Sequence, residues 1–165
     1  MENAVTFDEL SMLNQFKTVI LNAFEQDDTH TEKYWYNLFG KKKPRVYYSI
    51  TEARESTAFP CFVVRMTPLP NVGTIHSSEV EQYTRVDIAI EQYNQQVGNI
   101  GKEELGIMIN HRLKSVLQST FKVRITQNNE LMNINSTIYR RIIRCSIVYD
   151  NINEIIYQGD SYYGY

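Results

Sequence analysis

The run from residue 137 to residue 149 constrains the fold most strongly, because its side chains follow a period of two over an unusual length. Successive side chains of a β-strand point to opposite faces, so this pattern predicts one long strand. One face carries Tyr139, Arg141, Ile143, Cys145, Ile147 and Tyr149, and the other carries Ile138, Arg140, Ile142, Arg144, Ser146 and Val148. A strand of this length must pair with others, so we expect the preceding chain to supply a sheet and its cover.

Four earlier runs are typical of the other strands of this sheet. Residues 45–50 are rich in β-branched and aromatic side chains, and 121–126 form a second short candidate. Residues 61–66 and 82–91 alternate more clearly. The predicted faces are Phe62, Val64 and Met66 against Cys61, Val63 and Arg65, and Val86, Ile88 and Ile90 against Arg85, Asp87, Ala89 and Glu91. A turn at 127–130 and a weak extended piece at 131–136 then lead into the long strand.

Three segments have the spacing of helices. Residues 7–25 follow a capping box formed by Thr6 and Glu9, and residues 102–118 form a second long helix. The predicted apolar faces are Leu10, Leu13, Phe16, Val19, Ile20, Ala23 and Phe24 in the first helix, and Leu105, Met108, Ile109, Arg112, Leu113, Val116 and Leu117 in the second, with Asn110 on its polar face. Residues 32–39 predict a short helix closed by Gly40.

The order of these elements predicts an α+β fold. Strands that follow one another closely favour an antiparallel or mixed β-sheet, with the two main helices packed on it. Nothing divides the chain, so we expect one domain over residues 1–165, in which 151–165 form an extended C-terminal tail. The stretches at 67–81 and 93–101 are predicted to be connections, and the first is long enough to suggest a functional loop.

Composition and net charge limit the classes of function that the sequence supports. The net charge of −2 and the pI near 5.9 argue against a protein that grips nucleic acid over its whole surface. No apolar run approaches the roughly 20 residues of a membrane span and no leader pattern is visible, so we expect a protein folded in the cytosol. Cys61 and Cys145 fall in apolar strands, which predicts buried, reduced thiols.

Candidate catalytic and metal-binding residues are scattered along the sequence. His30, His76 and His111 have no second histidine at metal-ligand spacing. Asp87 and Glu91 share a strand face, but four residues along a strand separate their Cα atoms by roughly 13 Å, too far to share one ion. The chain also has no phosphate-binding glycine loop and no nucleophile elbow. We therefore expect no catalytic, cofactor-binding or metal-binding residues, and no enzyme.

The arginines of the long strand have two interpretations. Arg140 and Arg144 share a face, and three lysines at 41–43 form a second basic patch, so a nucleic-acid surface is conceivable. The favoured interpretation is cross-strand pairing of Arg140 or Arg144 with Asp87 or Glu91. Such pairs fix the register of two strands, and the chain is acidic overall.

Six stretches, taken in order, resemble a known family. They are the N-terminal helix, YY at 47–48, FPCFVVR at 59–65, YTRVDIAI at 83–90, the helix at 103–117, and IYRRIIRCSIVY at 138–149. Together they resemble the tail terminator and tail-completion proteins of long-tailed bacteriophages. The resemblance covers most of the chain and rests on the order of elements and a few short phrases.

The resemblance implies a small α+β subunit with helices on a β-sheet. Subunits of this family form a ring, typically a hexamer, that caps the tail tube and joins it to the head connector. The implied partners are other copies of the chain, the tail tube protein and the head connector or stopper protein, and DNA passes through the lumen without sequence-specific binding. The implied location is the head–tail junction of the virion, after assembly in the host cytoplasm. No cofactor, enzyme activity or membrane contact is implied.

Three parts of the chain depart from the family pattern: residues 34–43, the loop at 67–81 and the tyrosine-rich tail. They are interpreted as contacts peculiar to one virus, or as signs of a related connector protein. The candidate interface residues are Tyr34, Trp35, Phe39, Lys41, Lys42, Lys43, Val72, Ile75, Arg140 and Arg144. For the three aromatic residues, packing in the core is the alternative. For the whole chain, the alternatives are another head–tail connector component and a non-viral intracellular α+β binding module.

Overall fold

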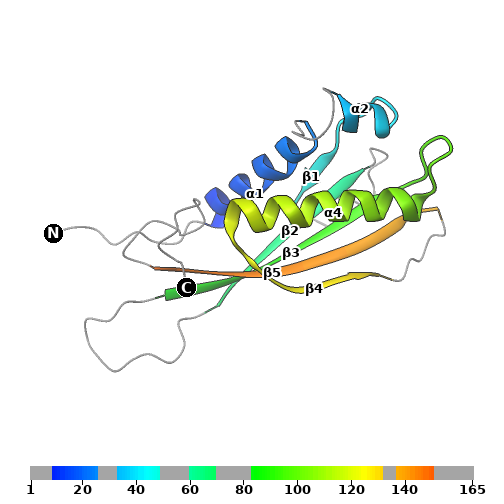
Figure 1. Cartoon of the computed structure of the whole chain (residues 1–165). Helices are drawn as coiled ribbons and strands as arrows, with labels where there is room; N and C mark the ends of the chain where they lie inside the picture. Colours follow the sequence, from blue (N-terminus) through cyan, green and yellow to red (C-terminus); the bar gives the residue numbers. More distant parts are fainter. Residues whose placement is uncertain (1–8, 26–32, 49–59, 70–82, 132–136, 151–165) are drawn as a thin grey trace, which may run out of the picture.

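The computed structural model describes residues 9–25, 33–48, 60–69, 83–131 and 137–150. In chain order these contain α1 (Glu9–Ala23), α2 (Tyr34–Leu38), β1 (Arg45–Tyr47), β2 (Cys61–Leu69), β3 (Tyr83–Asn94), α4 (Lys102–Phe121), β4 (Arg124–Glu130) and β5 (Tyr139–Asp150). The strands of these segments form one sheet in the order β1-β2-β3-β5-β4. β1 is parallel to β2, and the other neighbours are antiparallel. With α1 and α4 on one face of the sheet (Figure 1), the predicted α+β fold is confirmed.

The long predicted strand is β5, and it pairs along its whole length with β3. The register runs from Tyr83 opposite Asp150 to Asn94 opposite Tyr139, so each strand contributes 12 residues. β2 pairs with the other edge of β3, and β4 with the other edge of β5. The expectation that the long strand lies beside residues 82–91 is confirmed, and this pair forms the centre of the sheet.

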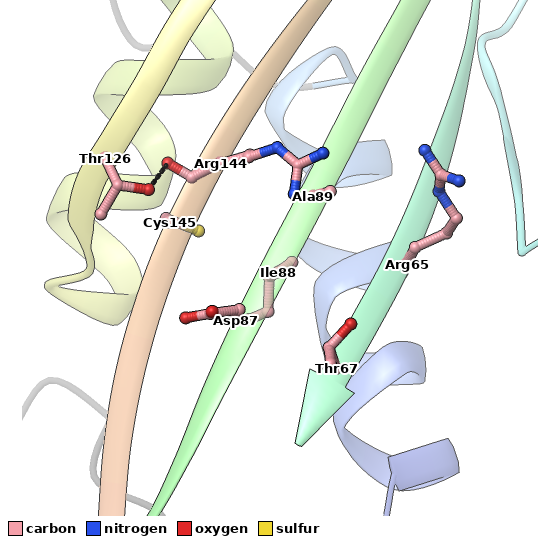
Figure 2. Close-up of a pocket in the computed structure, with 8 residues that line it drawn as sticks. All are labelled: Arg65, Thr67, Asp87, Ile88, Ala89, Thr126, Arg144 and Cys145. Carbon is pink, nitrogen blue, oxygen red and sulfur yellow. Dashed lines mark hydrogen bonds between the residues drawn. The ribbon is translucent and has the colours of Figure 1, made fainter. Parts of the chain in front are cut away.

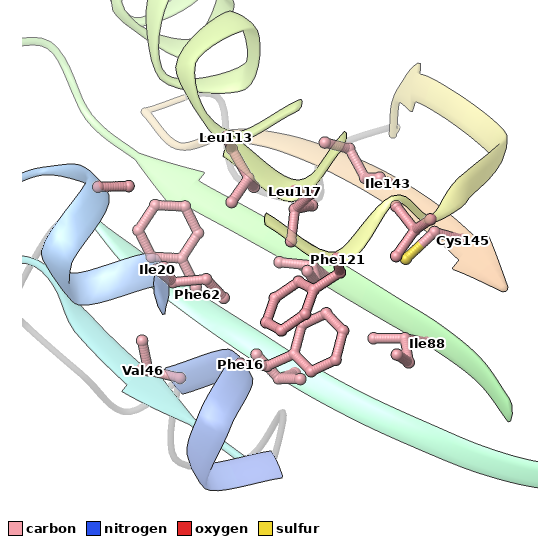
Figure 3. Close-up of a cluster of buried hydrophobic side chains, with 14 of the residues drawn as sticks. Phe16, Ile20, Val46, Phe62, Ile88, Leu113, Leu117, Phe121, Ile143 and Cys145 are labelled. Carbon is pink, nitrogen blue, oxygen red and sulfur yellow. The ribbon is translucent and has the colours of Figure 1, made fainter. Parts of the chain in front are cut away.

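Apolar side chains between the helices and the sheet form the core (Figure 3). The cluster includes Phe16 and Ile20 of α1, Phe62 and Val64 of β2, Ile88 of β3, Leu113, Leu117 and Phe121 of α4, and Ile143 and Cys145 of β5. The rings of Phe16 and Phe121 stack with centroids 4.1 Å apart, so the two helices also contact each other. Burying one large apolar side chain contributes about 1.5–3 kcal/mol, which makes this layer the main source of stability.

The buried stripe of α1 differs from the predicted one. It runs through Met12, Phe16 and Ile20, and Leu10 is 61% exposed. Each residue of a helix advances by about 100°, so Leu10 lies roughly 200° from Met12, almost on the opposite side. The prediction that Leu10 faces the core is therefore wrong. Thr6, the predicted cap, lies outside the described residues.

The first half of α4 contributes Leu105 and Ile109 to the core and also contacts polar side chains. Asn110, predicted to be exposed, is buried and exchanges two hydrogen bonds with Asn128 of β4: the Nδ2 of each donates to the Oδ1 of the other, at 3.0 and 3.1 Å. Arg141 Nε also donates to Asn128 Oδ1 at 3.0 Å. Gly106 lies against the ring of Tyr139, where any Cβ would collide with ring atoms. Glycine at this position lets α4 approach β5 closely.

The strands extend farther than their side-chain patterns predict. β2 continues through Leu69, into the predicted loop, and β3 continues through Asn94, into the predicted connection. β4 includes residues 127–130, predicted to be a turn, while Phe121 ends α4 and begins no strand. Backbone pairing with β3 or β5 extends these strands beyond their alternating runs. The remainder of the predicted loop, the piece at 132–136 and the tail at 151–165 lie outside the described residues.

The aromatic residues around α2 belong to the core. Trp35 is 5% exposed and Phe39 is 1% exposed. The ring centroid of Phe24 lies 5.1 Å from that of Trp35 and 5.8 Å from that of Phe39, while Tyr34 is partly buried. Core packing, the alternative for these residues, holds for Trp35 and Phe39, so neither is an exposed anchor. Gly40 follows with a φ of 70°, consistent with the predicted end of the helix.

Candidate functional site

The face of the sheet that points away from α1 and α4 carries Arg65 of β2, Asp87 of β3 and Arg144 of β5, and we call it the open face (Figure 2). Arg141 of β5 lies on the helix side. The register aligns Arg65 of β2, Ala89 of β3 and Arg144 of β5 in one row across the sheet. The neighbouring rows are Val63, Glu91 and Ile142 on one side, and Thr67, Asp87 and Ser146 on the other. The alternation in the sequence predicted this face correctly.

One half of the open face contains a buried charge cluster made of Glu91, Arg65, Arg140 and Tyr93. Glu91 is only 2% exposed. Its Oε1 accepts hydrogen bonds from Arg65 Nη2 at 2.7 Å and from Arg140 Nη2 at 3.3 Å, and its Oε2 accepts from the Tyr93 hydroxyl at 2.5 Å. A buried carboxylate requires such partners, because its desolvation is costly. The predicted pairing of Arg140 with Glu91 is confirmed.

The pKa of Tyr93 reflects its burial and the charges of this cluster. Burial raises the pKa of its phenol to about 12, with further upward contributions from the hydrogen bond to Glu91 and from the charge of Glu91. Arg140 acts in the opposite direction, and its guanidinium carbon lies 5.6 Å from the centroid of the Tyr93 ring. The neutral phenol therefore remains a hydrogen-bond donor to Glu91 at physiological pH. We interpret the cluster as a set of contacts that stabilises the fold.

The other half of the open face contains a hollow over Ala89. Its volume is about 200 Å³, and it is lined by Arg65, Thr67, Asp87, Ile88, Ala89, Thr126, Arg144 and Cys145. The methyl side chain of Ala89 leaves space between Arg65 and Arg144, which Figure 2 shows on either side of it. Arg144 is exposed and makes no ion pair with any residue that the structure describes. The Ala89 hollow is therefore a cationic site with an available guanidinium.

Asp87 lies at the rim of this hollow, not in the charge cluster. Its Oδ1 is 3.8 Å from Arg85 Nε, and both side chains are about half exposed. Glu91, the second carboxylate of this strand face, is already occupied by two arginines. In the described part of the chain, no three histidine, cysteine or acidic side chains lie close enough together to hold a metal ion.

A second concave surface lies between the end of α1 and the segment after α2. It has a volume of about 500 Å³ and is lined by Leu21, Phe24, Glu25, Lys33, Tyr36, Lys42, Lys43 and Pro44. Lys41, Lys42 and Lys43 are all exposed. The predicted basic patch is therefore accessible, and two of its lysines border an apolar floor.

The two cysteines are free and buried, and they lie on opposite faces of the sheet. Burial raises the pKa of each thiol to about 12, and the charge of Asp87 adds to the shift of Cys145. A thiol with so high a pKa is a poor nucleophile at neutral pH. The prediction of reduced, structural cysteines is confirmed. Of the other candidate residues, Val72 and Ile75 lie outside the described residues.

Sequence reasoning did not find the buried amides that connect the helix layer to β3. Gln92 Nε2 donates to the backbone oxygen of Gly106 at 2.7 Å, and Asn94 Nδ2 donates to that of Lys102 at 2.9 Å. Both side chains are buried. A run such as Gln-Tyr-Asn directly after an alternating strand reads as a loop, so no local signal marks these contacts.

No protein-family model matches the sequence, and no curated protein is significantly similar to it. Among the described helices, none has the length and apolar character needed to cross a membrane.

Proposed function

We propose that this protein is a structural subunit that forms a ring at the end of a phage tail tube and joins the tube to the head connector. The observation that carries the proposal is the difference between the two outer surfaces of the subunit. One is a layer of helices, and the other is a sheet face that exposes charged side chains of both signs around the Ala89 hollow. A ring needs two different surfaces that meet between neighbouring subunits.

The fold supports a role in assembly in a second way. The exposed part of the open face presents Arg85, Asp87 and Arg144, while the buried acid Glu91 is already paired with Arg65 and Arg140. Charges arranged in this way contribute specificity and orientation to a protein contact. The resemblance described above supplies the proposed partners: further copies of the chain, the tail tube protein and the connector or stopper protein.

The exposed lysines at 41–43 have a place in the same proposal. They lie beside α2, away from the open face, so they remain available for a second kind of contact. A basic patch beside the passage of DNA would attract the phosphate backbone without reading its sequence. We assign them to contacts with DNA or with an acidic surface of the connector.

Electron microscopy of particles made without this protein tests the proposal. We expect tails of uncontrolled length, or heads and tails that fail to join, and recovery of normal particles when the wild-type gene is supplied in trans. Normal, joined particles in its absence would contradict the proposal. If joining fails but the protein lies on the head side of the junction in labelled particles, it is another connector component.

A deletion separates folding from joining. We expect that removal of residues 72–78 leaves the unfolding transition unchanged but prevents the joining of heads to tails. Residues 67–81 form a long stretch without a clear strand or helix pattern in the sequence, although β2 extends through Leu69, and long loops are often functional. Unchanged yields of infectious particles would remove this loop from the list of contacts.

A further inference from the structure

We propose that neighbouring subunits meet by docking the first turn of α4 of one copy on the open face of the next. In this contact the Glu104 carboxylate lies in the Ala89 hollow, between the guanidinium groups of Arg65 and Arg144. The inference rests on the proposed ring function and names the contact that builds the ring.

The receiving surface has the geometry of a carboxylate site. Arg65 and Arg144 are each one strand away from Ala89, so their Cα atoms are about 10 Å apart, and both residues line the hollow. The Arg144 side chain extends toward Ala89, whereas that of Arg65 runs along its own strand (Figure 2). Arg65 uses one nitrogen for Glu91, but a guanidinium has five N–H donors. Arg144 has no acid partner among the described residues. One further carboxylate would complete the charge pairing of this face.

The donating surface lies at the start of α4. Glu103 and Glu104 are both exposed in its first turn, and Glu103 is already within 3.5 Å of Lys102 Nζ. Glu104 forms no ion pair with a described residue. Ile107, one turn later, is 57% exposed and is one of two large apolar side chains exposed in the described segments. Residues three apart on a helix are neighbours on its surface, so Glu104 and Ile107 offer one charged and one apolar contact at the start of α4.

The positions of the two surfaces determine the symmetry of the assembly. α4 lies on one face of the sheet (Figure 1), and the charged residues that line the Ala89 hollow lie on the other face (Figure 2). A contact between them therefore uses a different surface on each subunit, and each subunit offers both. Such a contact cannot pair two copies as a closed dimer. It continues from copy to copy, and it forms a ring where the rotation between neighbours closes and an open filament where it does not.

Reciprocal charge exchange tests the contact. Arg144→Glu and Glu104→Arg each place like charges at the interface, and we expect each variant alone to associate about 100-fold more weakly than the wild type. A mixture of the two variants should recover the wild-type mass, because in an alternating ring every contact is again between opposite charges. The chain that carries both substitutions should also form rings. Native mass spectrometry at low and high protein concentration measures the masses.

Matched controls make each result decisive. Arg45→Glu reverses an exposed arginine at the edge of the sheet, and Gln118→Arg adds a cation to α4 roughly 21 Å from Glu104. Neither should weaken assembly. Urea unfolding of every variant separates a lost contact from a lost fold. Rings that survive both single exchanges, variants that fail to complement each other, or a wild-type chain that stays monomeric at high concentration would each overturn the proposed contact.

The contact and the ring function fail in different ways. If particles lacking the protein have unjoined or overlong tails but the exchanged variants do not complement each other, the ring function stands and the contact is wrong. If the variants complement each other but such particles are normal, the contact stands and the tail function is wrong.

Discussion

Arg140 and Arg144 lie four residues apart on β5 and on the same face of the sheet, yet their surroundings differ. The side chain of Arg140 is 23% exposed, lies 3.3 Å from Glu91 and covers the ring of Tyr93. Arg144 is exposed at the Ala89 hollow and has no acid partner within the described residues. The two arginines therefore divide the open face into a buried half that stabilises the subunit and an exposed half that is available to a neighbour.

The difference teaches that the charge pattern of a strand does not assign a role to each charge. Asp87 and Glu91 both offered a carboxylate to the arginines, but only Glu91 is buried, and the arginines that reach it are Arg65 and Arg140. Breaking a desolvated ion pair lowers the free energy of unfolding strongly, because it leaves a buried charge without a partner. Breaking an exposed pair changes the free energy of unfolding little.

Removing the central carboxylate should have the largest effect. We expect Glu91→Ala to lower the free energy of unfolding by about 3 kcal/mol, because it leaves the partly buried Arg140 and the more exposed Arg65 without their acid partner. The value lies at the low end for a broken buried pair, since the Arg65 side chain is 45% exposed and can reach water. Urea unfolding followed by circular dichroism measures the change.

Asp87→Ala is the matched control for this prediction. It removes a carboxylate from the same strand face, but one that is half exposed and 3.8 Å from Arg85. The expected loss is below about 1 kcal/mol. Equal losses for Glu91→Ala and Asp87→Ala would contradict the division of the open face.

The two arginines themselves should give the next largest difference. Arg140→Ala removes a charge-assisted hydrogen bond and the cover of the Tyr93 ring, so we expect a loss of about 2 kcal/mol. Arg144→Ala should change the free energy of unfolding by less than about 0.5 kcal/mol, as exposed substitutions usually do. Only Arg144→Ala should weaken association in the native fold. The opposite ranking in the unfolding experiment would show that the halves have been assigned the wrong way round.

Tyr93→Phe should have the smallest effect, about 1 kcal/mol at neutral pH, because the substitution removes the hydrogen bond from the hydroxyl to Glu91 and keeps the ring. Its pH dependence is more specific. The folded state retains the phenol proton up to a pKa of about 12, whereas the unfolded chain loses it near the ordinary value of 10. The stability contributed by the protonated phenol is present below pH 10 and is lost as the pH rises toward 12.

The difference in stability between wild type and Tyr93→Phe should therefore shrink between pH 10 and pH 12. Cys61 and Cys145, whose pKa values are also raised, are present in both proteins, so their contribution cancels in the difference. A constant difference over this pH range would place Tyr93 outside the field of the buried cluster.

Alternation predicted the centre of this fold well. The faces of β2, β3 and β5 and the adjacency of β3 and β5 follow from side chains with a period of two, and an acid–arginine pair between these strands was expected from the same pattern. Which arginine meets which acid was not determined. That choice depends on register, and a shift of one residue moves every side chain to the other face.

Apart from Leu10, the errors described for β4, α4 and α2 arise from contacts between residues far apart in the sequence. Residues 127–130 join β4 and Asn110 is buried because the two elements exchange amide hydrogen bonds with each other, a long-range contact that no local pattern contains. Trp35 and Phe39 enter the core because Phe24 and Phe62 offer a surface for them, although a short amphipathic helix reads equally well as an exposed anchor. The Ala89 hollow forms because the small Ala89 lies between Arg65 and Arg144 on the two adjacent strands. This arrangement depends on strand register, which the sequence pattern alone does not give.

Disulfide cross-linking of a chain that carries both Arg144→Cys and Glu104→Cys tests the proposed ring contact most directly. Glu104 belongs to α4, and Arg144 lies on the face of the sheet that points away from this helix, so a bond between the two positions within one chain is not expected. The native thiols are buried, and their pKa values are raised. Mild oxidation of assembled protein should give a ladder of linked subunits that ends at the ring, with a hexamer expected from the family resemblance. Only uncrosslinked chains, in samples where rings are present by mass, would contradict the contact between α4 and the open face.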